Sequence, residues 1–146
     1  MIIKQTPVER RLWASGATGT DKSEGKLVKA SADGNTMSLL ASASDIPDGV
    51  VSNPDGNGGD LVRMNHPGIV QVRLNDTPGT IEDGTDLVAC DDATVKAATG
   101  AAGEVVVAKS VAPNTSGQGG CLHDAILVAR PAATPETAPA VTPGQS

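Results

Sequence analysis

The chain has 146 residues, a formal net charge of −6 and a hydrophobic content of 38%, much of which is alanine. With one tryptophan and no phenylalanine or tyrosine, its core must come mainly from valine, leucine and isoleucine. The length predicts one domain, and the acidic charge argues against a nucleic-acid-binding surface. A core this thin gains stability by burying further surface against a partner or a second copy.

Residues 1–24 contain few strand-forming residues, and we expect an extended N-terminal arm with at most a short helical turn over 9–13. Six of the eleven Lys and Arg residues lie within residues 1–30. This arm is either solvated or docked on an acidic neighbour. The apolar stretch within the first four residues is too short, and is followed too soon by a charge, for a signal peptide. The sequence contains no run of about 18 apolar residues, so no membrane span is predicted. We therefore expect a protein that is made and used without secretion.

The centre of the chain consists of short apolar runs separated by turn residues such as Asp-Gly and Pro-Gly. This spacing is typical of a sandwich or barrel. Residues 69–74 alternate apolar and polar side chains, as a half-buried strand does, whereas Val105, Val106 and Val107 predict a strand buried on both faces. The class is all-β, with strands expected at 26–30, 36–42, 49–52, 61–65, 68–74, 86–90, 94–97, 104–111 and 122–130.

Residues 131–146 carry four of the ten prolines, together with Ala and Thr. This composition predicts a flexible, disordered tail that cannot contribute to a core. The predicted organisation is thus an arm at 1–24, a β-barrel domain at 25–130 and a tail at 131–146.

The residues that could carry chemistry are few. His66 falls in a turn, and His123 precedes Asp124, but no third metal ligand has suitable spacing. Cys90 and Cys121 are expected to be reduced core residues, a bridge between them being the alternative.

Residues 55–63 match one repeat of a calcium-binding β-roll at most positions. That motif works only when several copies stack, so a hairpin loop is the better interpretation. The acids Asp83, Asp86, Asp91 and Asp92 could chelate a hard cation, although turn formation and solubility explain them equally well. We predict no metal and no cofactor.

Catalysis lacks the groups it needs. The sequence has no phosphate-binding glycine motif and no nucleophile-elbow motif, and neither histidine lies near a plausible Ser or Cys pattern. Sugar binding is disfavoured because Trp13 is the only large aromatic ring. These observations predict a non-catalytic binding or structural protein.

The order of the central segments resembles the capsid decoration, or head cement, proteins of tailed phages. The segments that carry the resemblance are GKLVK at 25–29, DGVV at 48–51, GIVQVRL at 68–74, IEDGTDLV at 81–88 and VVVAK at 105–109. The chain departs from that family at Val107, where a Gly more usually precedes the Ala, and in the long charged loop at 52–60.

The resemblance implies a small β-barrel or β-tulip-like sandwich on the outer surface of an icosahedral phage head. It would form a trimer or dimer there, and it would stabilise the lattice by bridging major capsid protein subunits. Arg and Trp are enriched at binding hot spots, so the basic arm is the expected contact. Its candidate residues are Lys4, Arg10, Arg11 and Trp13.

Three alternatives stay open. The arm could be disordered with no partner. The whole chain could instead be a non-catalytic receptor- or glycan-binding β module of a virion fibre or adhesin, and a calcium-dependent hydrolase or lyase is a third hypothesis.

Overall fold

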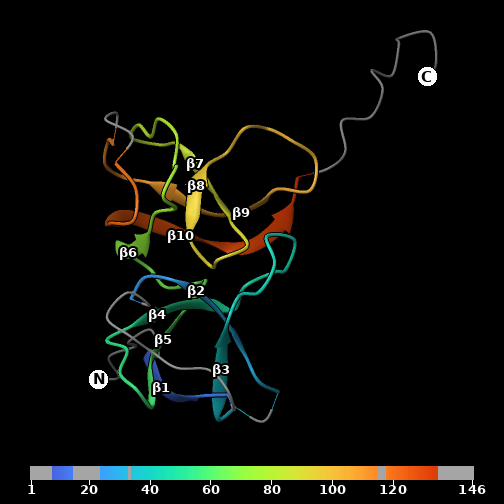
Figure 1. The fold of residues 1–146 in the computed structure, drawn as a ribbon, viewed down its shortest axis with the longest axis vertical. Helices are drawn as coiled ribbons and strands as arrows, with labels where there is room; N and C mark the ends of the chain where they lie inside the picture. Colours follow the sequence, from blue (N-terminus) through green and yellow to red (C-terminus); the bar gives the residue numbers. More distant parts are fainter. Residues whose placement is uncertain (1–7, 15–23, 33, 115–117, 135–146) are drawn as a thin grey trace, which may run out of the picture.

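The computed structural model describes residues 8–14, 24–32, 34–114 and 118–134, and within these residues the fold is all-β (Figure 1). No helix in the described residues is long and apolar enough to cross a membrane. The strands are β1 (Val8–Trp13), β2 (Leu27–Ala30), β3 (Thr36–Leu39), β4 (Gly49–Ser52), β5 (Gly58–Arg63), β6 (Val70–Arg73), β7 (Asp86–Ala89), β8 (Val95–Ala97), β9 (Val105–Ser110) and β10 (Leu122–Ala133).

The first five strands form a closed barrel in the order β1-β3-β2-β4-β5. β1 closes it by pairing antiparallel with β5, where Val8 lies opposite Val62, and parallel with β3, where Leu12 lies opposite Thr36. Two glycines allow the strands to approach closely. A Cβ on Gly49 would overlap the carbonyl oxygen of Val62, and one on Gly58 would overlap that of Arg11.

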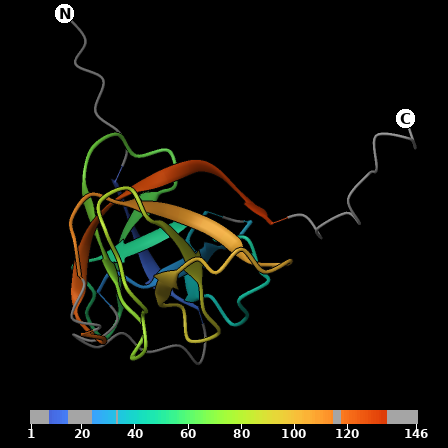
Figure 2. The ribbon, with the colours of Figure 1, turned by 90° about the horizontal axis from the view of Figure 1, so that it is seen from above.

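The last five strands form an open sheet in the order β6-β10-β9-β7-β8. β10 is the longest strand and curves across the molecule (Figures 1 and 2). Its pairing with β9 shifts register between Leu127 and Ala132, which is a bulge that bends the strand. The end strands of the sheet are β6 and β8, and a parallel bridge between Leu74, directly after β6, and Val95 of β8 joins them at one point.

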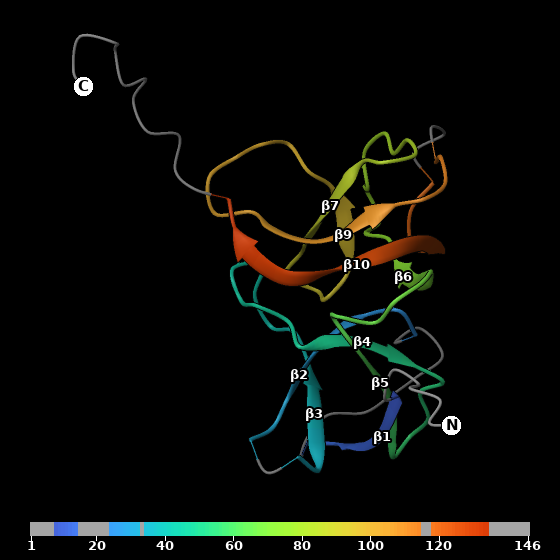
Figure 3. The ribbon, with the colours of Figure 1, turned by 180° about the vertical axis from the view of Figure 1, so that it is seen from behind.

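The sheet packs against the side of the barrel that contains β2 and β4 (Figure 3). Adjacent residues on these barrel strands are therefore buried on opposite faces. On β4, Val51 points into the barrel, whereas Val50 joins the core shared with the second sheet. Each such aliphatic side chain contributes about 1.5–3 kcal/mol when fully buried. One core thus joins the barrel and the sheet.

Nine of the ten strands lie where the sequence predicts them, and the all-β barrel prediction is confirmed. The alternation over 69–74 is also confirmed, since Val72 and Leu74 are buried and Gln71 is exposed. In β9, Val105 and Val107 are buried but Val106 is only partly so, which corrects the prediction of a strand buried on both faces.

The interpretation of residues 1–24 as an arm is wrong for Val8–Trp13, which form barrel strand β1 and not an arm or a helical turn. The barrel fold therefore begins well before residue 25. At the other end, β10 continues to Ala133, so the predicted tail at 131–146 begins within a strand. The predictions for residues 1–7, 15–23 and 135–146 lie outside the described residues.

Candidate interaction surface

The polar interior of the barrel is built on β1. Glu9, Arg11 and Trp13 alternate with the exposed Arg10 and Leu12, as the period of two in a strand requires. The inward positions therefore include a carboxylate, a guanidinium and the chain's one large aromatic ring.

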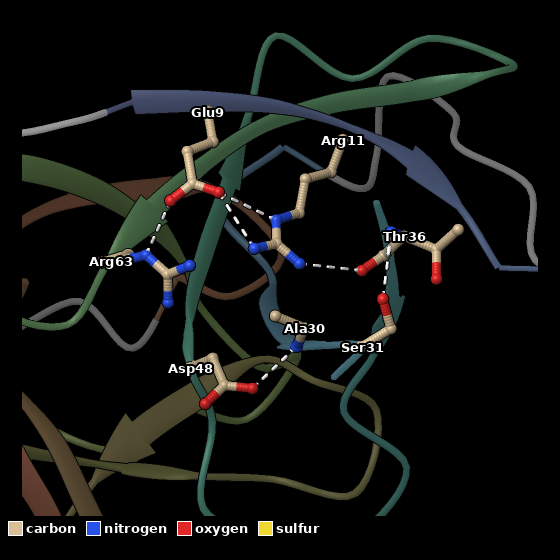
Figure 4. Close-up of polar contacts among 7 residues, drawn as sticks. All are labelled: Glu9, Arg11, Ala30, Ser31, Thr36, Asp48 and Arg63. Atoms are coloured by element: carbon tan, nitrogen blue, oxygen red, sulfur yellow. Dashed lines mark hydrogen bonds and ion pairs between the residues drawn. The ribbon is translucent and has the colours of Figure 1, made fainter. Parts of the chain in front are cut away.

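Glu9 links two arginines from different strands (Figure 4). Its Oε1 accepts a hydrogen bond from Nε of Arg63 at 2.9 Å, and its Oε2 accepts two from Arg11, at 2.9 Å and 3.1 Å. Arg11 also donates to the carbonyl oxygen of Thr36 at 3.3 Å. The hydrogen bond from Arg63, then that from Arg11, holds the pKa of Glu9 below its ordinary value. This network ties β1 to β5 and β3.

Trp13 fills the apolar part of the barrel and is only 8% exposed. Its indole Nε1 donates to the carbonyl oxygen of Asp55 at 2.8 Å, so its polar atom is satisfied. It packs in one cluster with aliphatic side chains and a methionine, namely Val28, Met37, Val51 and Leu61.

The loop at 53–57 closes the β4–β5 hairpin; the sequence predicted a hairpin loop over 55–63, of which 58–63 instead belong to β5. Oδ1 of Asp55 accepts hydrogen bonds from the backbone N–H groups of Asn57 at 2.8 Å and Gly58 at 2.9 Å. The same carboxylate forms an ion pair with Arg10. The backbone hydrogen bonds, with Arg10, hold the pKa of Asp55 below its ordinary value. This carboxylate already holds the turn and the arginine together.

The four residues predicted as partner contacts have different outcomes. Arg11, at 5% exposure, and Trp13 lie inside the barrel and bind groups of their own chain, so neither can reach a partner while the barrel is closed. Arg10 is exposed, in an ion pair with Asp55. Lys4 lies outside the described residues.

A serine and a histidine that sequence reasoning did not bring together meet between β9 and β10. Nε2 of His123 lies 2.7 Å from Oγ of Ser110, a distance at which a base can activate a nucleophile. Both residues are buried, Ser110 at 1% exposure, and the hydroxyl donates to the carbonyl oxygen of Ala112. A substrate cannot reach this serine in the folded chain. Asp124 points elsewhere, toward Gln71 at 3.4 Å.

The cysteines and acids have separate local roles. Cys90 and Cys121 are free, and burial raises the pKa of the Cys90 thiol. Asp91 accepts a hydrogen bond from the backbone N–H of Ala43 at 2.7 Å, and Asp86 pairs with Lys109 at 3.7 Å. No group of three or more His, Cys, Asp or Glu side chains in the described residues is arranged to hold a metal ion.

A cleft of about 380 Å³ lies between the outer face of β4 and β5 and the start of β6. Val50 and Val62 line its barrel side, and Ile69 and Gln71 line its sheet side. Acidic and polar groups complete it, including Glu24, Asp60 and His66. Among the residues that the structure describes, no Lys or Arg lines it. The cleft therefore combines aliphatic surface with negative charge.

No protein-family model and no curated protein matches this sequence. Among solved structures, the chain is similar to the N base of the head fiber gp8.5 of bacteriophage phi29, with a TM-score of 0.55. The match covers 85% of this chain and 97% of that chain, at 17% sequence identity. At this identity the likeness establishes a shared fold.

Proposed function

We propose that this protein is a structural component of a phage virion that binds the outer surface of the head. There it would bridge neighbouring major capsid protein subunits and stabilise the lattice, as a dimer or trimer. The observation that carries the proposal is the fold shared with a head fiber base over nearly the whole of that chain. The independent sequence resemblance to capsid decoration proteins supports the same location.

The interior chemistry supports a non-catalytic role. Ser110 and His123 form the one nucleophile–base pair noted in the described residues, and both are buried. Glu9 forms ion pairs with Arg11 on its own strand and with Arg63 on β5. These groups act as structural cross-links, which suits a protein that must resist mechanical load.

Co-sedimentation with empty, expanded heads of the phage that encodes the chain tests the proposal. We expect saturable binding of the full chain and a rise in the temperature at which the heads break. Light scattering on the chain alone should give the mass of a dimer or trimer. A chain that stays in the supernatant at all concentrations would overturn capsid binding.

The structure also limits which variants can test the predicted contact residues. Removing residues 1–20 would delete β1 and open the barrel, so weaker binding after that truncation would be uninformative. Lys4→Glu with Arg10→Glu reverses the candidate charges other than that of the buried Arg11. Lys109→Glu is the matched control, because Lys109 is an exposed cation on β9. Equal binding by both variants would remove Lys4 and Arg10 from the contact.

A second candidate is a non-catalytic receptor- or glycan-binding module of a fibre or adhesin. The similarity to the base of a fiber favours a fibre component. Glycan binding itself is disfavoured, because the one large aromatic ring of the sequence is buried in the barrel and cannot stack on a sugar. Specific hits on a glycan array, without binding to heads, would favour this candidate over the first.

A further inference from the structure

Three hydrogen-bonding groups of the described chain lie around the buried hydroxyl of Ser110, at the end of β9. Its Oγ is 2.5 Å from the carbonyl oxygen of Ala112 and 3.2 Å from the backbone nitrogen of the same residue. The third group is Nε2 of His123 on β10, at 2.7 Å. A serine hydroxyl donates one hydrogen bond and accepts two, so these three groups use its full capacity.

The direction of each of these hydrogen bonds follows from the chemistry of the partner. A carbonyl oxygen can only accept, so the one proton of the Ser110 hydroxyl is directed at Ala112. The backbone N–H of Ala112 can only donate, so it occupies one acceptor position of the hydroxyl oxygen. The hydroxyl has no second proton for the imidazole. The contact with Nε2 of His123 is therefore a hydrogen bond only when that nitrogen carries a proton.

We infer that His123 carries a proton on Nε2 and donates it to Ser110, and that the pair is a buried cross-link between β10 and β9. This polarity is the reverse of a nucleophile–base pair, in which the hydroxyl donates to an unprotonated ring nitrogen. A protonated Nε2 cannot take the proton of the serine. This cross-link is a property of the folded chain and does not depend on capsid binding.

The cross-link lies at the start of the connection between β9 and β10. Ala112 is the second residue of this connection, and both of its backbone groups are bonded to Ser110. Two residues further on, Asn114 exchanges two backbone hydrogen bonds with the buried Ile81, at 2.6 Å and 3.1 Å. The cross-link thus holds the start of the connection in the position from which Asn114 reaches Ile81.

Burial makes this set of hydrogen bonds costly to lose. Ser110 is 1% exposed and His123 is 7% exposed. Removing the hydroxyl would leave the Nε2 proton of His123 and the two backbone groups of Ala112 without the partner that satisfies them. A buried polar group without a partner destabilises the folded state. We therefore expect the connection to open more often in Ser110→Ala, while the rest of the fold is kept.

Long-range proton–nitrogen NMR correlations test the position of the proton. They are recorded on the natural chain under mildly alkaline conditions, so that the histidine rings are neutral. For His123 we expect a protonated Nε2 and an unprotonated Nδ1. A proton on Nδ1 instead would overturn the inference, because Ser110 would then have to donate to Nε2. This measurement needs no variant, so it stands even if Ser110→Ala fails to fold.

Exchange of the Nε2 proton with water tests the bond to the serine. In Ser110→Ala we expect this exchange to be about tenfold faster, the equivalent of one hydrogen bond. The matched control is Ser44→Ala, which removes the hydroxyl of an exposed serine in a loop and should leave the exchange unchanged. Equal exchange rates in the two variants would overturn the bond.

Hydrogen exchange at backbone amides tests the role of the pair as a cross-link. In Ser110→Ala the amides of Asn114 and Ile81 should lose protection, because the connection opens locally. The amide of Val28, in the barrel, should keep its protection. Unchanged protection at both Asn114 and Ile81 would overturn the cross-link, even with the proton found on Nε2.

Discussion

The closed barrel and the open sheet differ in how their strand edges are paired and in which side chains fill their interiors. The barrel has no free strand edge, and its interior holds one large ring and a charge network. The sheet is not closed, although a parallel bridge between Leu74 and Val95 joins its two end strands at one point, and its core is almost entirely aliphatic. We therefore expect the stability of the barrel to depend on a few large or charged side chains, and the stability of the sheet to depend on many small aliphatic side chains.

Trp13→Ala should have the largest effect, because it removes the ring that fills the barrel together with its hydrogen bond to Asp55. We expect a loss of about 3–5 kcal/mol, the usual cost of such a truncation. Urea unfolding followed by circular dichroism measures it. Leu12→Ala, next to it on the outer face at 55% exposure, should change stability by less than about 1 kcal/mol.

Hydrogen exchange in the same variant tests the contrast between the two regions. If the barrel opens separately, amides of Val28 and Leu61 lose more protection than those of Val88 and Val107. An equal loss of amide protection in the barrel and the sheet would show that they unfold as one cooperative unit, because they share a core. The two regions would then differ in architecture but not in local stability.

Gly58→Ala should have the next largest effect, because its Cβ would overlap the carbonyl oxygen of Arg11 where β5 meets β1. The strands must separate, and we expect a loss of about 3 kcal/mol, the upper end of the usual range for overpacking. Gly56→Ala in the same hairpin is the control, since a Cβ there meets nothing within 4 Å. Similar stabilities for the two variants would contradict the idea that barrel closure depends on this contact.

Sequence patterns predict nine strands but miss β1, and the reason is physical. Prediction of a strand relies on alternation between apolar inward and polar outward side chains. In β1 the inward positions include Glu9 and Arg11, so the pattern indicates a polar arm and not a strand. The same error made Arg11 and Trp13 candidate contacts, because the sequence does not show that Arg11 is buried against Glu9 or that Trp13 fills the barrel.

The candidate site depends even more on tertiary structure. The pairing of Ser110 with His123 follows from β9 and β10 being antiparallel, so aligning the two predicted strands could have found it. The cleft could not have been found in this way. Its walls come from β4, β5 and β6, which face each other only once the sheet packs on the barrel.

Arg11→Ala tests the charge network and should cost about 2 kcal/mol. This is less than the roughly 3–5 kcal/mol for breaking a fully buried pair, because Glu9 keeps its hydrogen bond to Arg63. The free energy of unfolding in urea measures it. Arg10→Ala, on the outer face of the same strand, should have a clearly smaller effect. If the two variants are equally stable, the inward network does not hold the barrel closed.

The pH dependence of the same network gives the smallest effect. The pKa of Glu9 is lowered from its ordinary value of 4.5, first by the hydrogen bond from Arg63, so the folded state favours its ionised form. Its contribution is fully present above pH 4.5 and is lost as pH falls through the lower folded pKa. The stability difference between the natural chain and Glu9→Gln should therefore be constant from pH 6 to 7, at no more than about 1 kcal/mol for a part-exposed pair, and shrink below pH 4.5. Urea titrations across this range measure it, and the decline should weaken in an Arg63→Gln background. A difference that stays constant down to pH 3 would mean that the charge of Glu9 adds nothing to barrel closure, leaving Trp13 and the close approach at Gly58 to account for it.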